Sequence, residues 1–491
     1  MAKLFELFKG KNNVNKDAQT GREQEPDKRL TPARKMCIEA VREATGWDRK
    51  TAENHIDDAR QRLGISYADY RRMKMYHFTP EEQEKRYGEM LHGKEQKNEG
   101  REECIEAAAR AQGISKKEAA EHVDKTRRAF KIKYEDYIKY SMYNMTGEEI
   151  RLLKGRLDFE RDDERVGIIL EKTGWSREEA LERFIDARKR TGCMFKEYYT
   201  YKFYDFSPEE QETLFLVRDS VKISKRYDKR RFSNMLLDKE WANGAFSDYL
   251  KRPWCMNVNL SFEEFTDKFA GIGKVIYKPA FGSRGQGAEA VTIDPDDMRK
   301  AYDHLVSLPD GVIEGFVKQH PEMNRLTPAS VNTIRIVTIS SKEEPVTQDG
   351  KLKDIAYAAV RIGGGSSIVD NFHSGGMVAA IDMESGTICT DAADMEGNVF
   401  PSHPVTGTVF KGFRIPCFDK ALKLVSDMVD EKEVEGYIGW DIAISEDGPV
   451  LIEVNTRPGA VLLTTPYISE RKGMKHLMEK YLWSRDATPE S

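Results

Sequence analysis

The chain has 491 residues, which exceeds the size that one hydrophobic core usually organises, so we expect two or three domains. Its 78 Lys and Arg residues nearly balance its 83 Asp and Glu residues, and the net charge of -5 excludes a general preference for polyanions such as nucleic acids. No apolar run reaches about eighteen residues and no signal-peptide pattern is present, so we expect a cytoplasmic protein without a transmembrane segment. The six cysteines show no C-x-x-C spacing, which predicts buried reduced thiols rather than zinc ligands or disulfides.

The N-terminal half contains a repeat. Residues 1–34 are polar and predict a disordered or tethering segment. From 35 to about 215, three stretches align without gaps at offsets of 67 and 128 residues. Aligned positions include Gly46, Gly113 and Gly174; Ala52, Ala119 and Ala180; Arg60, Arg127 and Arg188; and Tyr70, Tyr137 and Tyr198. Each stretch carries helix-capping signals, so we predict an all-α array of three helical repeats.

The aromatic residues of this array are expected to form its core, because aromatics at helical spacing more often pack together than bind ligands. The alternative is a surface that recruits a protein, a carrier or a polymer. No net basic stripe or recognition helix is evident, which argues against nucleic acid as a partner. Residues 216–235 then form a basic connector, which we expect to be a solvated helix face or, alternatively, a contact for an anionic substrate.

A strand that ends in a lysine precedes a glycine-rich turn in the second half. Residues 275–279 are β-forming and contain Lys278, residues 280–287 read AFGSRGQG, and residues 288–293 are again β-forming. Glycine lets backbone N–H groups approach phosphate oxygens, and lysine supplies a positive charge. No helix is expected after the turn and no G-K-[ST] follows, which predicts a hairpin over a triphosphate rather than a Walker loop or a Rossmann turn. The alternative is a glycine-rich hairpin without a ligand.

Two further β-forming runs follow this hairpin. Residues 312–317 predict a strand whose backbone could hydrogen-bond an adenine edge. Residues 330–338 predict a strand that presents Asn332 toward a cleft, with Arg335 as a second candidate for the same cleft. The polar loop after them contains His373, which is more often a satisfied loop histidine than a catalyst.

The segment from Gly436 to Gly459 predicts a metal-binding hairpin. A three-residue loop ending at Gly448 would pair Ser445 with Pro449 and place Asp441 opposite Glu453. Asn455 lies two residues beyond Glu453 and therefore points to the same face. Oxygen ligands of this kind suit Mg²⁺, which keeps waters and phosphate oxygens in its other positions. The alternative is a surface hairpin with solvated acids.

The order of these parts resembles the ATP-grasp superfamily. More narrowly, the motifs KPAFGSRGQG, SVNTIRIVT, VDNFHSGG and GWDIAISEDGPVLIEVNTRPG are similar to the sugar-transfer-associated ATP-grasp family, over residues from about 230 to 480. The resemblance implies an α+β fold class, in which two α+β subdomains clasp ATP within residues 236–484. The array of three helical repeats would precede this domain, and a tail at 485–491 would follow it.

The resemblance also implies the roles of individual residues. Residues that hold or cover the phosphates of ATP would be Lys239, Lys278, Ser283, Gly285 and Gly287. The adenine hinge would comprise Glu314 and Val317, with Glu322 near the ribose. Mg²⁺ would be bound by Asp441, Glu453 and Asn455. The phosphoryl group and an acyl phosphate would be stabilised by Arg335, Arg457 and Asn371.

The family's chemistry would be the ADP-forming, ATP-dependent joining of a carboxylate to an amine, one of them part of a sugar, a polysaccharide precursor or a peptide. Two features depart from this pattern. Many such ligases have an arginine two residues before the metal aspartate, where this chain has Gly439. The α/β domain that commonly precedes the core is replaced by the helical array. A phosphotransferase on the same scaffold, or a nucleotide-sensing adaptor whose repeats bind a partner, are therefore the alternatives.

Overall fold

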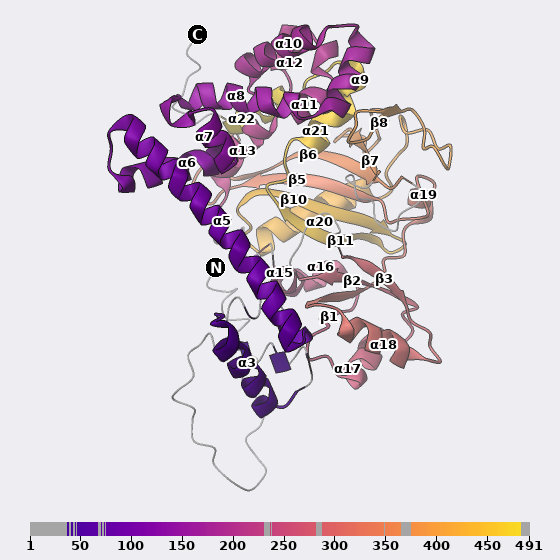
Figure 1. The fold of residues 1–491 in the computed structure, drawn as a ribbon. Coiled ribbons are helices and arrows are strands. Elements are labelled where there is room, and N and C mark those ends of the chain that lie inside the picture. Colours follow the sequence, from indigo (N-terminus) through magenta and orange to yellow (C-terminus); the bar gives the residue numbers. More distant parts are fainter. Residues whose placement is uncertain are drawn as a thin grey trace. The chain divides into compact units, whose positions relative to one another are not determined.

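A computed structural model describes residues 37–482, apart from 39–40, 43–44, 46, 67–69, 71–72, 74, 230–235, 237, 281–286, 348 and 365–374. The chain divides into two compact units, Glu6–Lys154 and Gly155–Ser491, which we call the N-terminal and the C-terminal unit (Figure 1). None of the helices in the described ranges has both the length and the apolar character needed to span a bilayer.

The N-terminal unit is helical. Its elements are α3 (Arg49–Leu63), η2 (Met75–His77), α5 (Pro80–Gln112), α6 (Lys116–Phe130), α7 (Tyr134–Lys139), η3 (Met142–Asn144) and the first part of α8 (Gly147–Glu160). The long helix α5 begins at a capping box between Thr79 and Glu82, with Pro80 in its first turn. Buried apolar residues such as Ile56 and Tyr70 form a core around α3. The local structure therefore follows the capping and spacing signals of the sequence.

Three helices of 15 residues begin and end at aligned positions of the sequence. They are α3, α6 and, in the C-terminal unit, α10 (Arg177–Thr191). Their N-cap side chains, on Asp48, Ser115 and Ser176, each accept a backbone N–H bond. A residue in the left-handed conformation follows each helix, namely Gly64, Lys131 and Gly192.

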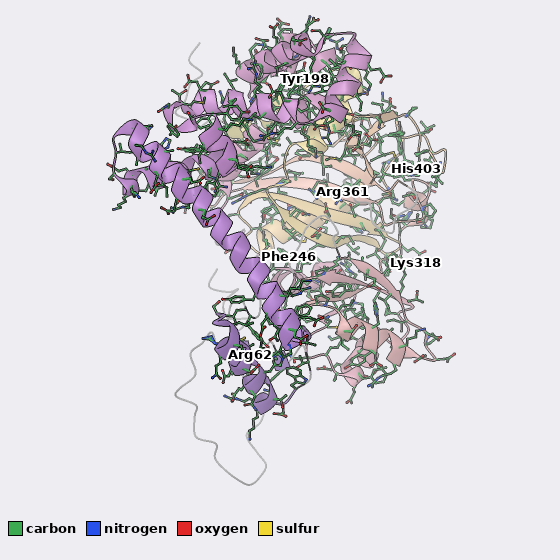
Figure 2. All side chains as sticks on the ribbon, viewed as in Figure 1. Arg62, Tyr198, Phe246, Lys318, Arg361 and His403 are labelled. Carbon is green, nitrogen blue, oxygen red and sulfur yellow. The ribbon has the colours of Figure 1, made fainter. Side chains whose placement is uncertain are left out.

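The C-terminal unit begins with a helical segment. Its elements are the rest of α8, then α9 (Asp163–Thr173), α10, α11 (Phe195–Thr200), η4 (Phe203–Asp205), α12 (Pro208–Glu212) and α13 (Val217–Tyr227). An aromatic core joins them, in which the ring centroid of Phe184 lies 5.3 Å from that of Phe195 and 5.2 Å from that of Tyr198 (Tyr198 is labelled in Figure 2). Helix α13 packs against the larger sheet described below. Two basic residues of the expected connector bind glutamates, Arg226 to Glu344 at 3.1 Å and Lys229 to Glu343 at 2.9 Å.

A four-stranded antiparallel sheet follows, in the order β1-β4-β2-β3. The strands are β1 (Trp254–Met256), β2 (Lys274–Pro279), β3 (Glu289–Thr292) and β4 (Gly311–Gly315). Helices α17 (Phe262–Phe269) and α18 (Met298–Ser307) bury Phe265 and Leu305 with the strand residues Val275 and Ile313. Two short helices, α15 (Lys239–Ala245) and α16 (Ser247–Leu250), precede β1.

The larger sheet has seven strands in the order β11-β10-β5-β6-β7-β8-β9, and all pairs are antiparallel (Figure 1). The strands are β5 (Thr333–Ser340), β6 (Lys353–Ile362), β7 (Met377–Ile381), β8 (Ala392–Ala393), β9 (Val399–Phe400), β10 (Gly436–Ser445) and β11 (Gly448–Thr456). Alternate residues of β5 and β10, such as Ile336 and Trp440, pack with α20 (Phe418–Glu431). The other face carries Val337 and Tyr437, which pack with α13 and α22 (Lys475–Leu482). Because side chains alternate along a strand, this second face also carries Arg335 and Asp441.

The cysteines only partly match their prediction. Cys37, Cys104, Cys193 and Cys255 are buried thiols, and none of the six cysteines forms a disulfide within the described residues. Cys389 is exposed and Cys417 is half-buried, so the prediction of burial is wrong for these two. Both lie in connections rather than in the core: Cys389 follows a turn beyond β7, and Cys417 precedes α20 with a φ of +53°.

Candidate active site

A buried ion cluster lies in the four-stranded sheet, around Glu314 of β4. This residue is 1% exposed. Its carboxylate accepts hydrogen bonds from Arg252 Nε at 3.0 Å, Lys278 Nζ at 2.9 Å and Asn243 Nδ2 at 2.9 Å. Burial alone would raise the pKa of Glu314, but Arg252 and Lys278 outweigh it and hold the pKa at about 2. Glu314 is therefore ionised, and it fixes the position of the Lys278 ammonium group.

The hairpin of β10 and β11 pairs Asp441 with Glu453, as the sequence predicts. The expected turn is wrong, however, because Ser445 pairs with Gly448 and only Glu446 and Asp447 form the loop. Such a loop alone would place Asp441 opposite Ile452. A β-bulge after Asp441 makes Ile452 an extra residue and restores the pairing with Glu453. The two differences from the predicted hairpin therefore cancel at the site.

The bulge also connects the hairpin to the four-stranded sheet. The carbonyl of Ile452 accepts a hydrogen bond from Lys278 Nζ at 3.2 Å, and the carbonyl of Leu451 accepts one from Arg252 Nη1 at 2.6 Å. Buried carbonyl groups need donors, and at a bulge the neighbouring strand cannot supply all of them. The two cations that bind Glu314 thus also join the two sheets.

Asp441 lies in a second ion cluster on the larger sheet. It is 1% exposed and lies directly opposite Arg335 of β5. Its Oδ2 accepts hydrogen bonds from Arg335 Nη2 at 2.9 Å, Arg361 Nη1 at 2.9 Å and Asn455 Nδ2 at 3.0 Å (Arg361 is labelled in Figure 2). Burial alone would raise the pKa of Asp441, but the two arginines outweigh it and hold the pKa below its usual value. The aspartate is ionised and shared between two guanidinium groups.

Gly439 makes room for Arg335. A Cβ atom at Gly439 would lie 2.8 Å from Arg335 Cδ and 3.0 Å from Pro458 Cβ. Real Cβ contacts are not that short, so Arg335 occupies space that any larger residue at 439 would need. Position 439, where the resemblance leads us to expect an arginine, therefore lies beside an arginine that comes from the neighbouring strand.

We expect Gly439→Ala to lower the free energy of unfolding by about 1–3 kcal/mol, because Arg335 is held by Asp441 and cannot easily move away. Urea unfolding monitored by circular dichroism measures the change. Gly273→Ala is the matched control, since an added Cβ there meets nothing within 4 Å and the backbone has no positive φ. Equal losses in the two variants would contradict this account of Gly439.

Glu453 lies between the two clusters. Among the described residues, none donates a hydrogen bond to its carboxylate. Burial and the neighbouring Asp441 raise the pKa of Glu453, and Lys278 and Lys239 oppose them. Burial likewise lowers the pKa of Lys239, and Glu453 opposes it. Two lysines, two carboxylates and one amide therefore converge here. Of the two acids, Asp441 has a lowered pKa and Glu453 has a raised one, so the negative charge of Glu453 is the less stabilised by its protein partners.

Arg457 follows β11 with a φ of +55°. Its Nε donates to Asp228 Oδ2 at 3.2 Å, and Asp228 Oδ1 accepts the backbone N–H of Tyr437 at 3.0 Å. Burial raises the pKa of Asp228, and its bonds to Tyr437 and Arg457 oppose the rise. The side chain of Arg457 is 63% exposed, so Asp228 orients the guanidinium group while most of it stays accessible.

Of the residues predicted to contact the nucleoside, Glu314 lies in β4, and Val317 and Glu322 follow that strand. Val317 is half-buried, and the segment beyond it pairs with the hairpin, because His320 N donates to the Ile444 carbonyl at 2.9 Å. The exposed Glu322 binds Arg325 at 2.8 Å. The Glu314 carboxylate is engaged by Lys278 and its other buried partners, and the role of Glu314 and Val317 as an adenine hinge stays a prediction.

Asn332 does not face a cleft, so that expectation is wrong. It is 0% exposed and donates to Gln319 Oε1 at 3.0 Å and to the carbonyls of Met323 and Thr327 at 3.0 and 3.1 Å. A buried amide needs such partners. Asn332 therefore holds the connection between β4 and β5 in place.

Part of the predicted site lies outside the described residues, namely Ser283, Gly285, Asn371 and His373. Gly287 is described and has a φ of +74°, where a Cβ would meet Pro279 Cγ at 3.0 Å. A glycine is thus required at the end of the glycine-rich turn.

Sequence reasoning missed Arg252, Asn243 and Arg361. Arg361 lies two residues from Ala359, which pairs with Arg335, so both arginines lie on one face of the sheet; the sequence shows the alternation but not the pairing. Arg252 and Asn243 lie on short segments before β1, where no periodic pattern indicates which way a side chain points.

The residues present fit one Mg²⁺ ion at Glu453 and Asn455. Asn455 donates through its Nδ2, which leaves its Oδ1 as an acceptor, and Glu453 is an undercompensated carboxylate. Oxygen donors of this kind are the ligands that Mg²⁺ prefers. Asp441 would join them only by sharing its carboxylate with Arg335 and Arg361. Within the described residues, no group of three or more His, Cys, Asp or Glu side chains is placed to hold a metal, as expected for a set that includes an amide.

The two sheets, the lysine strand and the acidic hairpin define an ATP-grasp protein. Residues 223–480, more than half of the chain, match the sugar-transfer associated ATP-grasp family. The chain therefore belongs to that family. No curated protein matches the chain.

The solved structures that the chain matches include ligases and synthetases. N5-carboxyaminoimidazole ribonucleotide synthetase, in its ADP complex, is 15% identical with a TM-score of 0.28, covering 46% of this chain and 46% of that one. D-alanyl-alanine synthetase A from Vibrio cholerae is 13% identical with a TM-score of 0.30, covering 50% and 63%. D-alanine–D-alanine ligase from Bacillus anthracis, complexed with ATP, is 15% identical with a TM-score of 0.27, covering 50% and 65%. The chain thus spans less than two thirds of the length of each of these proteins, and the family assignment rests on the sequence match.

Proposed function

We propose that the protein is an ADP-forming ligase that uses ATP to join a carboxylate to an amine through an acyl phosphate. The observation that carries the proposal is the position of Lys278. Its ammonium group binds the ionised Glu314 of one sheet and the Ile452 carbonyl of the other, beside the undercompensated Glu453. A fixed positive charge beside an acid whose pKa is raised by burial and by Asp441 suits phosphate oxygens and Mg²⁺ together.

Each charged or amide residue of the candidate site would have a defined part in this reaction. Lys278 and Lys239 bind phosphate oxygens, and Glu453 and Asn455 hold Mg²⁺, which neutralises phosphate charge when bound. Arg361 and Arg335 supply positive charge beside the hairpin. The exposed Arg457, oriented by Asp228, binds the carboxylate substrate or its phosphorylated form. Catalysis of this kind depends on positioning and electrostatics.

The bonds balance without a protein nucleophile. A carboxylate oxygen of the acid attacks the γ-phosphorus of ATP, and the bond to the β,γ-bridging oxygen breaks, which releases ADP. The amine nitrogen then attacks the acyl carbon, inorganic phosphate leaves with the former carboxylate oxygen, and the amine proton passes to solvent or phosphate. The products are an amide, ADP and phosphate.

The finer assignments are also proposals. We place the ATP-grasp domain at 236–484, with an N-terminal tether at 1–34, a helical region at 35–215, a connector at 216–235 and a tail at 485–491, in a cytoplasmic protein. The aligned first and last residues of α3, α6 and α10, together with their matching N-caps, support a helical region built of three repeats. The family name supports a sugar or polysaccharide precursor as one substrate, and we assign its recruitment, or that of its carrier, to the helical region.

A shortened chain that begins at residue 155 tests the role of the N-terminal unit, which holds the larger part of the helical region. Because the C-terminal unit has its own cores, we expect it to keep ADP binding within about threefold while losing turnover of the natural acceptor. Isothermal titration with ADP and a phosphate-release assay measure the two quantities. Unchanged turnover of the natural acceptor would show that the N-terminal unit is dispensable for recruitment.

Phosphate release from ATP and Mg²⁺, measured against a pooled library of acids, amino acids and amino sugars, tests the proposed reaction. We expect release that requires both an acid and an amine, and a product whose mass equals acid plus amine minus water. AMP and pyrophosphate would contradict the proposal. A phosphorylated acceptor formed without an amine would instead establish the phosphotransferase, and ATP binding without turnover would favour the adaptor.

A further inference from the structure

A cavity of about 590 Å³ that is open to solvent lies at the C-terminal end of α6, within the N-terminal unit. Its charged lining consists of four basic residues and one acid, Arg127, Arg128, Lys131, Lys133 and Asp124. The acid does not offset the positive charge, because the Asp124 carboxylate is bound by Arg101 through two hydrogen bonds of 3.0 and 2.8 Å. The free charge that faces the cavity is therefore positive.

One of these cations has a structural role. Arg127 Nε donates to the Ile132 carbonyl at 3.0 Å, and its guanidinium group lies 3.3 Å above the Tyr134 ring. The aligned Arg188 makes the corresponding bond to the Cys193 carbonyl. This arginine therefore belongs to the helix-turn scaffold, and the remaining three cations need another explanation.

Arg128, Lys131 and Lys133 are exposed, and they occur together only in the second stretch. The first stretch has Gln61, Gly64 and Ser66 at these positions, and the third has Lys189, Gly192 and Met194. The difference at Lys131 is the most informative. It has a φ of +53°, in the left-handed region that the aligned Gly64 and Gly192 occupy without strain. The second stretch thus accepts backbone strain where the others avoid it, and the strained residue places a charge on the cavity.

We propose that this cavity binds an anionic ligand that carries phosphate or carboxylate groups. The cavity is larger than a single small anion, and its three cations come from both ends of a turn, at Arg128 and at Lys133. A ligand with two or more anionic groups, such as a diphosphate or an oligomer of acidic sugars, matches that spread of charge. The site is separate from the proposed ligase chemistry and does not depend on it.

Binding of inorganic pyrophosphate and of trigalacturonate to the full-length protein, measured by isothermal titration, tests the proposal. The variant Arg128→Gln/Lys131→Gly/Lys133→Ser gives the cavity the residues of the first stretch. The matched control Lys50→Ser/Lys117→Ser/Lys189→Gln removes three positive charges from exposed helix positions elsewhere. Pyrophosphate can also enter a nucleotide site, so the difference between the two variants is the quantity compared.

We expect at least one probe to bind about tenfold or more weakly to the cavity variant, with a change below about twofold in the control. Loss of pyrophosphate binding alone indicates a phosphate ligand, and loss of trigalacturonate binding alone indicates an acidic sugar. Lys131→Gly by itself should weaken binding while raising the melting temperature, because it relieves the left-handed strain. Equal losses in cavity variant and control, or no binding of either probe, would overturn the proposal.

Discussion

Replacing Glu314 with Gln should lower the free energy of unfolding by about 3 kcal/mol or more, because the change leaves two buried cations without their anion. Arg252 and Lys278 have side chains that are only 7% and 14% exposed, so water cannot take the place of the carboxylate. The same cations hold the Leu451 and Ile452 carbonyls, so the two sheets should also separate more easily. Urea unfolding gives the first quantity, and hydrogen exchange of the β11 amides reports the second.

Glu289→Gln is the matched control for this prediction. Glu289 lies in the same sheet and binds His304 at 2.7 Å, but both side chains are largely exposed, so its loss should cost less than about 1 kcal/mol. A similar loss in both variants would show that the Glu314 cluster does not stabilise the fold through burial.

The pH dependence of stability provides a second test of Glu314. A carboxyl whose pKa falls to about 2 on folding contributes stability that is fully present above its unfolded pKa. This contribution is lost as the pH falls from about 4.5 toward about 2. Glu314→Gln should therefore flatten the decline of the unfolding free energy across that range. An unchanged acid profile would contradict the ionised cluster.

Replacing Glu453 with Gln together with Asn455 with Ala should reduce Mg²⁺-dependent turnover by about 100-fold or more, because it removes both proposed metal ligands. The fold should remain intact. Burial and Asp441 already raise the pKa of Glu453, so the loss of its charge relieves repulsion. A phosphate-release assay at varied Mg²⁺ concentration, with circular dichroism of the same samples, measures both effects.

Asp447→Asn is the matched control for the double variant, since it removes one acid from the exposed tip of the same hairpin. Turnover in the control should stay within about twofold of the wild type. Wild-type rates in the double variant would show that the hairpin does not hold the metal.

In the wild-type protein, the affinity for Mg²⁺ should fall as the pH is lowered through a value above the ordinary pKa of glutamate, because a protonated Glu453 cannot bind the cation.

The hairpin of β10 and β11 shows which features of the site the sequence predicts and which it does not. Strand propensity and alternation placed Glu453 and Asn455 on one face, and the pairing of Glu453 with Asp441 is confirmed. The loop length was wrong, and an unpredicted bulge at Ile452 compensated for it. A bulge leaves no clear signal in a run such as VLIEVN, because every residue there suits a strand.

The ion pairs of the site could not be predicted from the sequence, for a different reason. Arg335 and Asp441 are 106 residues apart, and only the order of strands β10, β5 and β6 brings them together. The engagement of Glu314 by Arg252 depends likewise on the antiparallel pairing of β1 with β4. Sequence patterns identify a strand and its faces, but the neighbour of a strand is set by tertiary packing.

The most direct test of the proposed chemistry follows one oxygen atom. An acid substrate found in the phosphate-release screen is labelled with ¹⁸O in its carboxylate and converted with ATP and the amine. If an acyl phosphate forms, one carboxylate oxygen leaves with the phosphate, so mass spectrometry should find one ¹⁸O atom in the inorganic phosphate and one in the amide. Unlabelled phosphate, or ¹⁸O in AMP, would contradict the account.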